Sequence, residues 1–357
     1  MNKKIVVFGG GTGISYLLKG LNLFPVDITA VISVSDNGSS TGKLREEFLM
    51  PAMGDIRKVI TSLSDVDTKI KGLLEYRFNT YSDLNGHPIG NLIMVAMYNM
   101  TGNLKESIEV LRKFLNIKHK VLPLSEDYLT LMGETYNGKI IEGEEEITKE
   151  QTKYKRLFYK EEPKIEKEVL KSILEADLII FSMGSLYTSI LPHLISEEIK
   201  NTLEQTKCPI LYTCNAVTQP GETDNFTVSD HLKILNKYLN KRKIDVVIAP
   251  NTIIPEKIVK KYETKEQKDL VKIDKKEIEK LNCELIESDN LTIENNTIRH
   301  DSLKLANAVF NYIMRWFYVL YNRSKKRNMY FKPNKIRRYS TTFRISKKYR
   351  YWTKRRY

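Results

Sequence analysis

Short apolar runs alternate with longer segments of helical spacing along most of this chain. The runs are four to eight residues long and rich in β-branched side chains, which is typical of strands buried on both faces. They cover residues 5–8, 27–34, 176–181, 209–214 and 244–249. Helical spacing predicts helices over 14–21, 64–78, 87–100, 166–175 and 303–321. This alternation predicts an α/β fold with a Rossmann-like, doubly wound, mostly parallel sheet.

The pattern changes between residues 120 and 162. Three short strand-like runs occupy 121–124, 128–136 and 139–147, and Asn137-Gly138 between two of them is a hairpin turn signal. We interpret 120–162 as a β insertion outside the parallel sheet, and its acidic run 142–146 as a solvated edge. The core is then divided into residues 1–119 and 163–322, and 323–357 form a basic tail.

A glycine-rich turn follows the first predicted strand. Gly10, Gly11 and Gly13, with Thr12 between them, lead directly into a helix start. Without Cβ atoms the backbone can approach an anion closely, and the helix start directs N–H groups at it. A tight turn that binds nothing is the alternative. In the dinucleotide pattern G-x-G-x-x-G the third glycine would stand at Ile14, so a generic NAD site is a weak match.

Polar loops follow the other predicted strands. Asp36 lies where dinucleotide folds place a ribose-binding carboxylate, and Ser39 beside it could donate to a second phosphate. Similar loops occupy 182–189 and 215–223. Because parallel strands end at one edge of a sheet, we expect these loops to line one crevice, although a solvated loop around Asp36 is an equal alternative. The helix over 87–100 is nearly all apolar after Asn91, which predicts a buried central helix whose start faces the crevice.

Composition is that of a soluble globular protein, with 41% hydrophobic and 29% charged residues among 357. No signal peptide precedes the first strand, and no run before residue 300 approaches the ~20 apolar residues of a membrane span. We therefore expect a cytoplasmic protein whose three cysteines are reduced thiols. The histidines show no metal spacing and no Ser/His/Asp or Cys/His arrangement is evident, so we assign neither a metal site nor a catalytic residue.

The net charge of +14 is concentrated at the C-terminal end. Residues 323–357 contain 15 Lys and Arg and no acidic residue, which leaves 43 basic against 44 acidic residues in the rest of the chain. Three interpretations of this tail stay open: a solvated, largely disordered segment, an anchor on an anionic membrane surface, or a nucleic-acid-binding segment. The sequence also leaves open whether the chain forms a homo-oligomer.

Six separated motifs carry a family resemblance that covers about residues 3–315. They are Gly9-Gly10-Gly11-Thr12-Gly13, Gly54-Asp55-Ile56-Arg57, Gly86-His87-Pro88-Ile89-Gly90-Asn91, Gly184-Ser185-Leu186-Tyr187-Thr188-Ser189, Asn215 with 218–224, and Arg299-His300-Asp301. Together they resemble the bacterial YvcK-type gluconeogenesis factors, which are related to the archaeal 2-phospho-L-lactate transferase CofD.

The resemblance implies a cytoplasmic regulatory protein that binds a UDP-sugar, UDP-GlcNAc or UDP-glucose. It further implies a role in growth and cell shape on gluconeogenic carbon sources. The transferase relatives imply the alternative, an enzyme that moves a phospholactyl group from a nucleoside diphosphate with Mg²⁺. No other cofactor follows from the resemblance.

The resemblance also implies roles for single residues. The two glycine-containing loops would hold phosphates, a second group would face the crevice, and a third would contact the nucleotide-sugar. These groups are Gly10, Gly11, Thr12 and Gly13 with Gly184, Ser185, Leu186, Tyr187 and Thr188; Asp36, Ser39, Asn91 and Asn215; and Tyr262 and Arg299.

Two departures from the family pattern matter. The family loop usually carries two adjacent acids where this chain has Asp36-Asn37, so one carboxylate is missing. This weakens a metal-dependent transferase mechanism that needs paired acids, and favours a binding protein. The family also tends to have Gly-Pro where Ser182-Met183 stand here, which affects the shape of that loop.

Overall fold

The computed structural model describes residues 2–150 and 152–329, with side chains up to residue 322. Residues 1–313 form one compact unit and residues from 314 onward form a second. The predicted tail over 323–357 lies outside the residues whose side chains are described. Everything below concerns the first unit unless stated.

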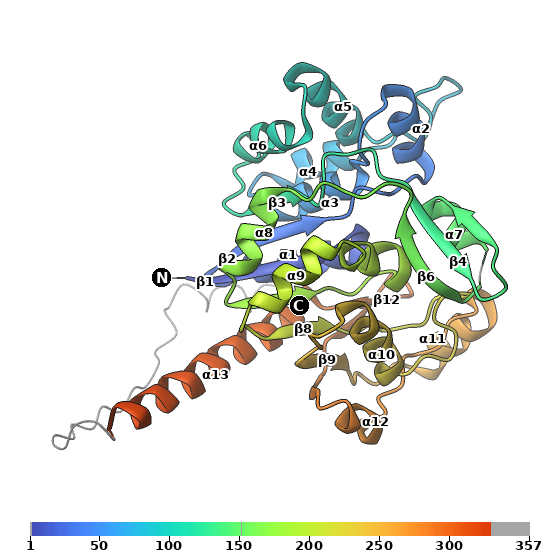
Figure 1. The fold of residues 1–357 in the computed structure, drawn as a ribbon. Coiled ribbons are helices and arrows are strands. Elements are labelled where there is room, and N and C mark those ends of the chain that lie inside the picture. The colour runs from blue at the N-terminus through green and yellow to red at the C-terminus, as the bar shows by residue number, and fades with distance from the viewer. Residues whose placement is uncertain (1, 151, 330–357) are drawn as a thin grey trace, which may run out of the picture. The chain divides into compact units, whose positions relative to one another are not determined.

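Seven parallel strands form the central sheet, and helices flank it (Figure 1). The strand order is β10-β9-β8-β7-β1-β2-β3, and every neighbouring pair is parallel. The bounds are β1 (Lys3–Gly9), β2 (Val26–Ile32), β3 (Lys120–Pro123), β7 (Leu178–Phe181), β8 (Ile210–Thr213), β9 (Val246–Pro250) and β10 (Glu284–Ser288). The predicted α/β fold with a doubly wound parallel sheet is confirmed.

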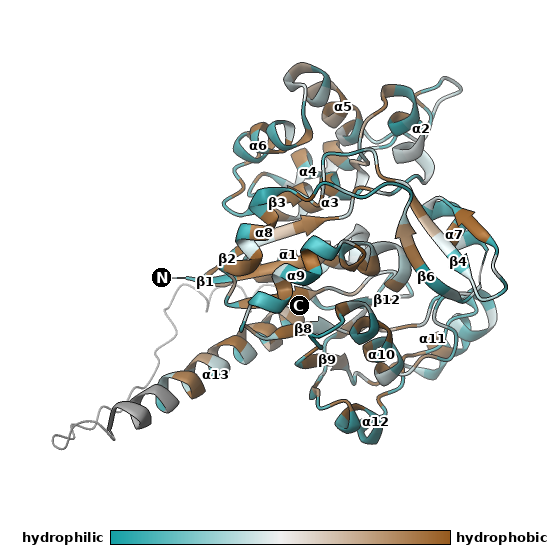
Figure 2. Cartoon of the chain, viewed as in Figure 1, coloured by the Kyte–Doolittle hydropathy of each residue, from teal (hydrophilic) through white to brown (hydrophobic). Residues whose placement is uncertain are grey.

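Helices lie in the connections between these strands. Their bounds are α1 (Gly11–Leu21), α2 (Ser39–Phe48), α3 (Gly54–Leu63), α4 (Thr68–Glu75), α5 (Ile89–Thr101), α6 (Leu104–Phe114), α8 (Lys167–Leu174), α9 (Glu197–Gln205), α10 (Val228–Leu239), α11 (Glu256–Lys261) and α12 (Lys275–Lys280). Short π and 3-10 helices lie at η1 (Leu186–Ile190), η2 (Leu191–Leu194) and η3 (Tyr262–Glu266). Strands β7 and β8 are buried along their whole length, as is β1 from Ile5 onward, and these largely apolar strands form the middle of the sheet (Figure 2).

The insertion is a separate three-stranded antiparallel sheet in the order β5-β4-β6. It consists of β4 (Leu131–Thr135), β5 (Ile140–Glu142), α7 (Glu144–Lys149) and β6 (Tyr154–Tyr159). The assignment of residues 121–124 to the insertion is wrong, because Lys120–Pro123 form β3 and pair with β2 in the main sheet. The four residues 121–124 are too short a run for their composition to indicate which sheet they join.

Helix α5 differs from its predicted central position. Asn91, Met94 and Val95 are buried, but Met100 is 79% exposed and several other apolar residues are half-buried. The prediction of a wholly buried central helix is therefore wrong, since one face of the helix is open in the described chain.

The C-terminal part contains a hairpin that the sequence reading missed and a helix that it predicted. The hairpin pairs β11 (Leu291–Glu294) with β12 (Thr297–His300) in antiparallel register. Helix α13 (Ser302–Met329) begins in the first unit and continues into the second.

Candidate functional site

The crevice lies where the order in which the chain adds strands to the sheet reverses, between β1 and β7. From β1 the chain builds outward through β2 and β3, and then returns to the other side of β1 with β7, β8, β9 and β10. The loops after β1 and β7 meet at this point, at the carboxyl ends of the strands, where open α/β sheets bind their ligands. The sequence predicted a site at this edge from its polar loops.

A cavity of about 310 Å³ occupies this crevice. Three of the predicted loops, the segment of Lys268 and the β11–β12 hairpin contribute to it. Of the predicted site residues, those that line it are Gly10, Gly11, Thr12, Gly13, Gly184, Ser185, Asn215 and Arg299. Side chains that converge on one cavity from five distant segments are the usual sign of a ligand site.

The glycine loop forms the floor of this cavity and leads into α1. Gly11 has φ +64°, which favours glycine, and α1 begins at this residue. The described helix has no side-chain cap and no acidic residue in its first turn. Its first N–H groups and the positive end of its dipole therefore suit an anion.

Asn215 holds the second loop in place. Its Nδ2 donates to the Gly184 carbonyl at 2.7 Å, and its Oδ1 accepts the Gly184 N–H at 3.3 Å. The Tyr212 hydroxyl donates to the same Oδ1 at 3.2 Å. Asn215 thus lines the cavity while its amide fixes the loop backbone.

The loop beyond Ser185 already binds a carboxyl group of the protein itself. Glu222 Oε1 accepts the Tyr187 N–H at 2.7 Å and the Ser185 hydroxyl at 2.8 Å. Burial raises the pKa of Glu222 to about 7, and the hydrogen bonds that it accepts partly offset this increase. Leu186, Tyr187 and Thr188 are buried in η1 and do not line the cavity, so the structure does not bring them to it.

Asp36 and Asp55 lie beside the cavity rather than in it. Asp36 Oδ1 accepts the Gly38 N–H at 2.8 Å, and Ser39 next to it is exposed. Asp55 pairs with Lys58 at 2.9 Å and lies against the glycine loop, 2.8 Å from where a Cβ of Gly10 would stand. Burial, and then the charge of Asp55, raise the pKa of Asp36.

A third carboxyl group comes from the insertion. Burial, followed by the charges of Asp36 and Asp55, raises the pKa of Glu144 well above its usual value, and hydrogen bonding with Thr188 lowers it. The expectation of a solvated edge is therefore wrong for Glu144. The acidic run 142–146 gave no sign of which carboxyl group would be buried. The packing of α7 decides that it is Glu144.

Asn91 belongs to a buried polar network. Its Oδ1 accepts from Arg57 Nε at 2.9 Å, and its Nδ2 donates to the Ser40 hydroxyl at 3.0 Å. Ser40 in turn contacts His87 Nδ1 at 2.8 Å. Two of the six motifs thus support each other behind the crevice, and Asn91 does not line the cavity.

Tyr262 also lies away from the cavity. It is 4% exposed in an apolar cluster with Ile258, Leu291 and Ile298, and its hydroxyl accepts the Ile298 N–H at 2.8 Å. The residue after Ile298 is Arg299, whose exposed side chain does line the cavity. Tyr262 is therefore placed to position the strand that carries Arg299.

Sequence reasoning missed several cavity residues. Tyr16 lies one turn into α1, Lys268 follows η3, and Gln219 and His300 occur inside recognised motifs without an assigned role. Burial lowers the pKa of His300 to about 4, and neither ring nitrogen has a hydrogen-bond partner in the described structure. His300 could have been predicted to line the cavity, because it lies in the same motif as Arg299. Nothing in the sequence indicated Tyr16 or Lys268.

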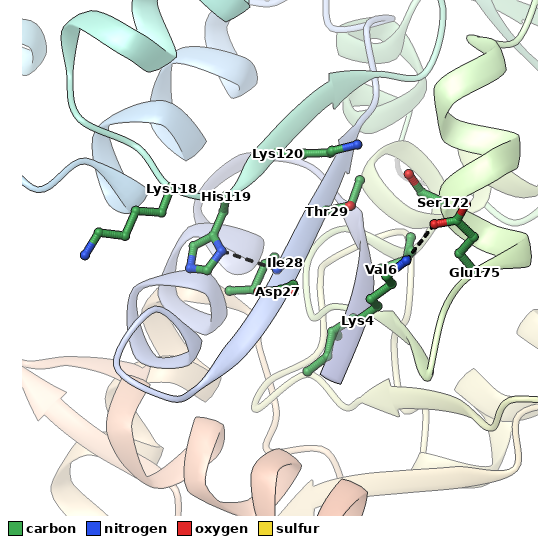
Figure 3. Close-up of a pocket in the computed structure, with 11 residues that line it drawn as sticks. Lys4, Val6, Asp27, Ile28, Thr29, Lys118, His119, Lys120, Ser172 and Glu175 are labelled. Carbon is green, nitrogen blue, oxygen red and sulfur yellow. Dashed lines mark hydrogen bonds and ion pairs between the residues drawn. The ribbon is translucent and has the colours of Figure 1, made fainter. Parts of the chain in front are cut away.

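A second cavity of about 310 Å³ lies at the opposite, amino ends of β1, β2 and β3 (Figure 3). Its polar groups are largely paired with the protein itself. Lys4 contacts Glu175 at 2.7 Å, Lys120 contacts Glu168 at 2.7 Å, and His119 Nδ1 accepts the Ile28 N–H at 3.3 Å. We interpret this rim as a stabilising network rather than a ligand site.

Comparisons with known proteins agree on one family. The family described as "2-phospho-L-lactate transferase CofD" matches residues 5–291. The gluconeogenesis factor of Bacillus subtilis is 41% identical over 308 residues, which cover 86% of this chain and 96% of that protein. The gluconeogenesis factor of Halalkalibacterium halodurans is 38% identical over 308 residues, covering 86% and 95%.

A solved structure agrees as well. The crystal structure of a protein from Bacillus halodurans has a TM-score of 0.84 and 37% sequence identity, and covers 87% of this chain and 100% of that one. Within the residues that the structure describes, no helix is sufficiently long and apolar to span a membrane.

Proposed function

The chain belongs to the CofD family, and on that premise we propose that it is a regulatory protein that binds a nucleotide-sugar, UDP-GlcNAc or UDP-glucose. The proposal includes a role on gluconeogenic carbon sources, which the relatives named gluconeogenesis factor support. It also includes a cytoplasmic location and a role in growth and cell shape, which the family resemblance implies. The observation that carries it is the cavity of about 310 Å³ lined by the glycine loop and Arg299.

The chemistry of the cavity suits a diphosphate. No side chain caps the N–H groups at the start of α1, so they can bind a negative charge, and Asp55 beside the loop is paired with Lys58. Arg299 can bind two phosphate oxygens at once, because its guanidinium presents parallel N–H donors. Tyr16 offers an aromatic face to a base or sugar ring, and the volume is in the range of small-molecule sites.

Binding of nucleotides to Arg299→Ala tests this proposal. We expect UDP-sugars to raise the melting temperature of the native protein, and the variant to bind them about 10- to 100-fold more weakly, as for a lost charged hydrogen bond. Lys243→Ala, an equal charge change at an exposed position, is the control and should bind normally. The proposal is contradicted if only NAD raises the melting temperature of the native protein, or if no nucleotide raises it.

A transferase is the second candidate, and a specific observation favours it. Asp55 lies next to the glycine loop and Asp36 interacts with Asp55, and oxygen ligands from one or two carboxylates with phosphate are what Mg²⁺ prefers. In the described residues no group of three or more His, Cys, Asp or Glu side chains is arranged to hold a metal ion. A bound Mg²⁺ would thus rely on these two carboxylates and on the ligand, and would neutralise phosphate charge during group transfer.

Phosphorus NMR distinguishes the two candidates. A nucleotide-sugar incubated with the protein and Mg²⁺ should keep its diphosphate resonances if the protein only binds it. New phosphate resonances that disappear in Asp55→Asn would favour the transferase. Asp65→Asn is a matched control, since Asp65 lies beyond α3 and away from the glycine loop.

A further inference from the structure

The described residues that line the cavity at the glycine loop include two cations and no acid. The cations are Lys268 and Arg299, and none of the 17 lining residues is Asp or Glu. The start of α1 adds the positive end of a helix dipole. Asp55 lies beside this lining, and its charge is paired with Lys58. Positive charge at several points of one cavity suits a ligand with more than one negative group.

Backbone hydrogen bonds hold the segment of Lys268 against the loop after β8. The Thr218 N–H donates to the Asp269 carbonyl at 2.8 Å, and the Val271 N–H donates to the Ala216 carbonyl at 3.1 Å. The Thr218 hydroxyl also accepts the Asp269 N–H at 2.9 Å. Because Ala216 lines the cavity itself, these contacts fix the segment that carries Lys268 to the cavity wall.

Tyr262 connects this segment to the hairpin that carries Arg299. Its carbonyl accepts the Lys268 N–H at 3.1 Å, and its hydroxyl accepts the Ile298 N–H at 2.8 Å. Ile298 directly precedes Arg299 in β12. One buried residue therefore positions the backbone of both cationic residues of the cavity. The family resemblance implies a role for Arg299, whereas it implies none for Lys268.

The ammonium group of Lys268 is paired with a carboxylate of the protein. Lys268 Nζ donates to Glu266 Oε2 at 3.2 Å, and Glu266 Oε1 lies 3.6 Å from Lys261 Nζ. The Lys268 and Glu266 side chains are 32% and 30% exposed, and ion pairs near the surface contribute little to stability. Because Lys261 also pairs with Glu266, this carboxylate keeps a cation when Lys268 moves away. An anionic ligand can therefore take over Lys268 at low cost.

We propose that Lys268 is the second cation that binds a diphosphate in this cavity, and that Glu266 holds its ammonium group until the ligand is present. The inference rests on the proposed binding of a nucleotide-sugar at this site. One phosphoryl group then lies on the N–H groups of α1, and the other meets Arg299 and Lys268. A lysine suits an exchange between two anions, because its ammonium group is a point charge on a flexible stem.

Lys268→Met tests the binding role, since it removes the charge and keeps the apolar stem. We expect the affinity for UDP-GlcNAc and for inorganic pyrophosphate, measured by calorimetry in EDTA, to fall about tenfold or more, as for a lost charged hydrogen bond. Uridine has no phosphate, so its affinity should stay the same. Unchanged affinity for the two anions, or an equal loss for uridine, overturns the role of Lys268.

Two further variants serve as controls for Lys268→Met. Lys268→Arg keeps the positive charge and should retain most of the affinity for both anions. Lys265→Met makes the same change at an exposed position of η3 that does not line the cavity, so it should bind normally. An equal loss of affinity in Lys265→Met would show that Lys268 acts only through the overall charge of the protein, and overturns its binding role.

Glu266→Gln tests whether this carboxylate holds Lys268. We expect it to raise the affinity for UDP-GlcNAc about two- to fivefold, because the ammonium group no longer has to leave a carboxylate. The gain should disappear when Lys268→Met is added. Glu263→Gln, at an exposed position of η3, is the control for the charge change. No gain in Glu266→Gln, or the same gain in the double variant, overturns the role of Glu266.

Inorganic pyrophosphate separates this inference from the proposed function. A native protein that binds pyrophosphate but not UDP-GlcNAc contradicts the proposed function, while weaker pyrophosphate binding in Lys268→Met still supports the role of Lys268. UDP-GlcNAc binding that is equal in native protein and Lys268→Met leaves the proposed function intact and overturns the inference. A native protein that binds neither anion contradicts both.

Discussion

Gly13 lies where the first turn of α1 meets the loop after β7. A Cβ atom at this position would overlap the carbonyl oxygen of Met183, which is backbone and cannot rotate away. Gly72 in α4 is the opposite case, because a Cβ there would meet no atom within 4 Å. The same substitution should therefore have opposite effects at the two positions.

We expect Gly13→Ala to lower the free energy of unfolding by at least about 2 kcal/mol, as overpacking against a fixed atom does. Gly72→Ala should raise it by about 0.5–1 kcal/mol, since alanine favours a helix interior. Urea unfolding of both variants measures these changes. Equal and small effects would show that α1 can shift away from Met183.

Glu222 is expected to make stability depend on pH. Its pKa rises from 4.5 to about 7 on folding, so between these values the native state holds a proton that the unfolded state has released. The free energy of unfolding should therefore fall as the pH rises through this window, by about 3 kcal/mol at 1.36 kcal/mol per pKa unit.

Glu222→Gln should remove this part of the pH dependence, because the amide keeps the acceptor without a charge. Urea unfolding at pH 4.5 and 7.5 measures it, with exposed Glu263→Gln as the control. A pH dependence that is the same in Glu222→Gln and native protein would show that Glu222 is ionised throughout.

At the scale of elements, the β11–β12 hairpin brings Arg299 and His300 to the cavity, and Tyr262 fixes this hairpin. Tyr262→Phe leaves the buried Ile298 N–H without its acceptor, which should cost about 1–3 kcal/mol of stability. We expect faster hydrogen exchange over residues 291–300 and an equal loss of affinity for UDP and GDP.

Tyr81→Phe, at a fully exposed position, is the control for this substitution. Unchanged stability together with weaker binding would instead support the direct contact between Tyr262 and the nucleotide that the family resemblance implies. An equal effect on both nucleotides supports positioning, because a direct contact distinguishes their bases.

At the scale of the whole molecule, charge is divided between the body and residues 323–357. We propose that this basic segment anchors the chain on an anionic surface, since each basic residue near such a membrane contributes about 1 kcal/mol. Full-length protein should sediment with vesicles that contain anionic lipid, and less so at high salt. The chain shortened to 1–322 should stay in solution; equal sedimentation contradicts the anchor.

The sequence by itself determined the parallel sheet, the location of the crevice and eight of the 17 residues that line its cavity. Buried strands are recognised by their apolar runs. Glycines and polar residues after these runs mark the loops at the carboxyl ends of the strands, where ligands bind. The loops of Gly10 to Gly13, Gly184 and Asn215 could therefore be selected from the local pattern, whereas Arg299 came only from the family resemblance. The strands and the loops that follow them depend on residues that are adjacent in the chain, so the sequence shows them directly.

Only the tertiary structure decided which polar groups are free for a ligand and which are used by the protein. Glu222 occupies the N–H groups predicted to hold phosphate, Asn91 is bound within its own network, and Tyr262 supports a hairpin. Asn37, interpreted as a lost carboxylate, accepts the Glu145 N–H of α7 from over 100 residues away. Such pairings depend on which distant segments pack together, and no local pattern records that.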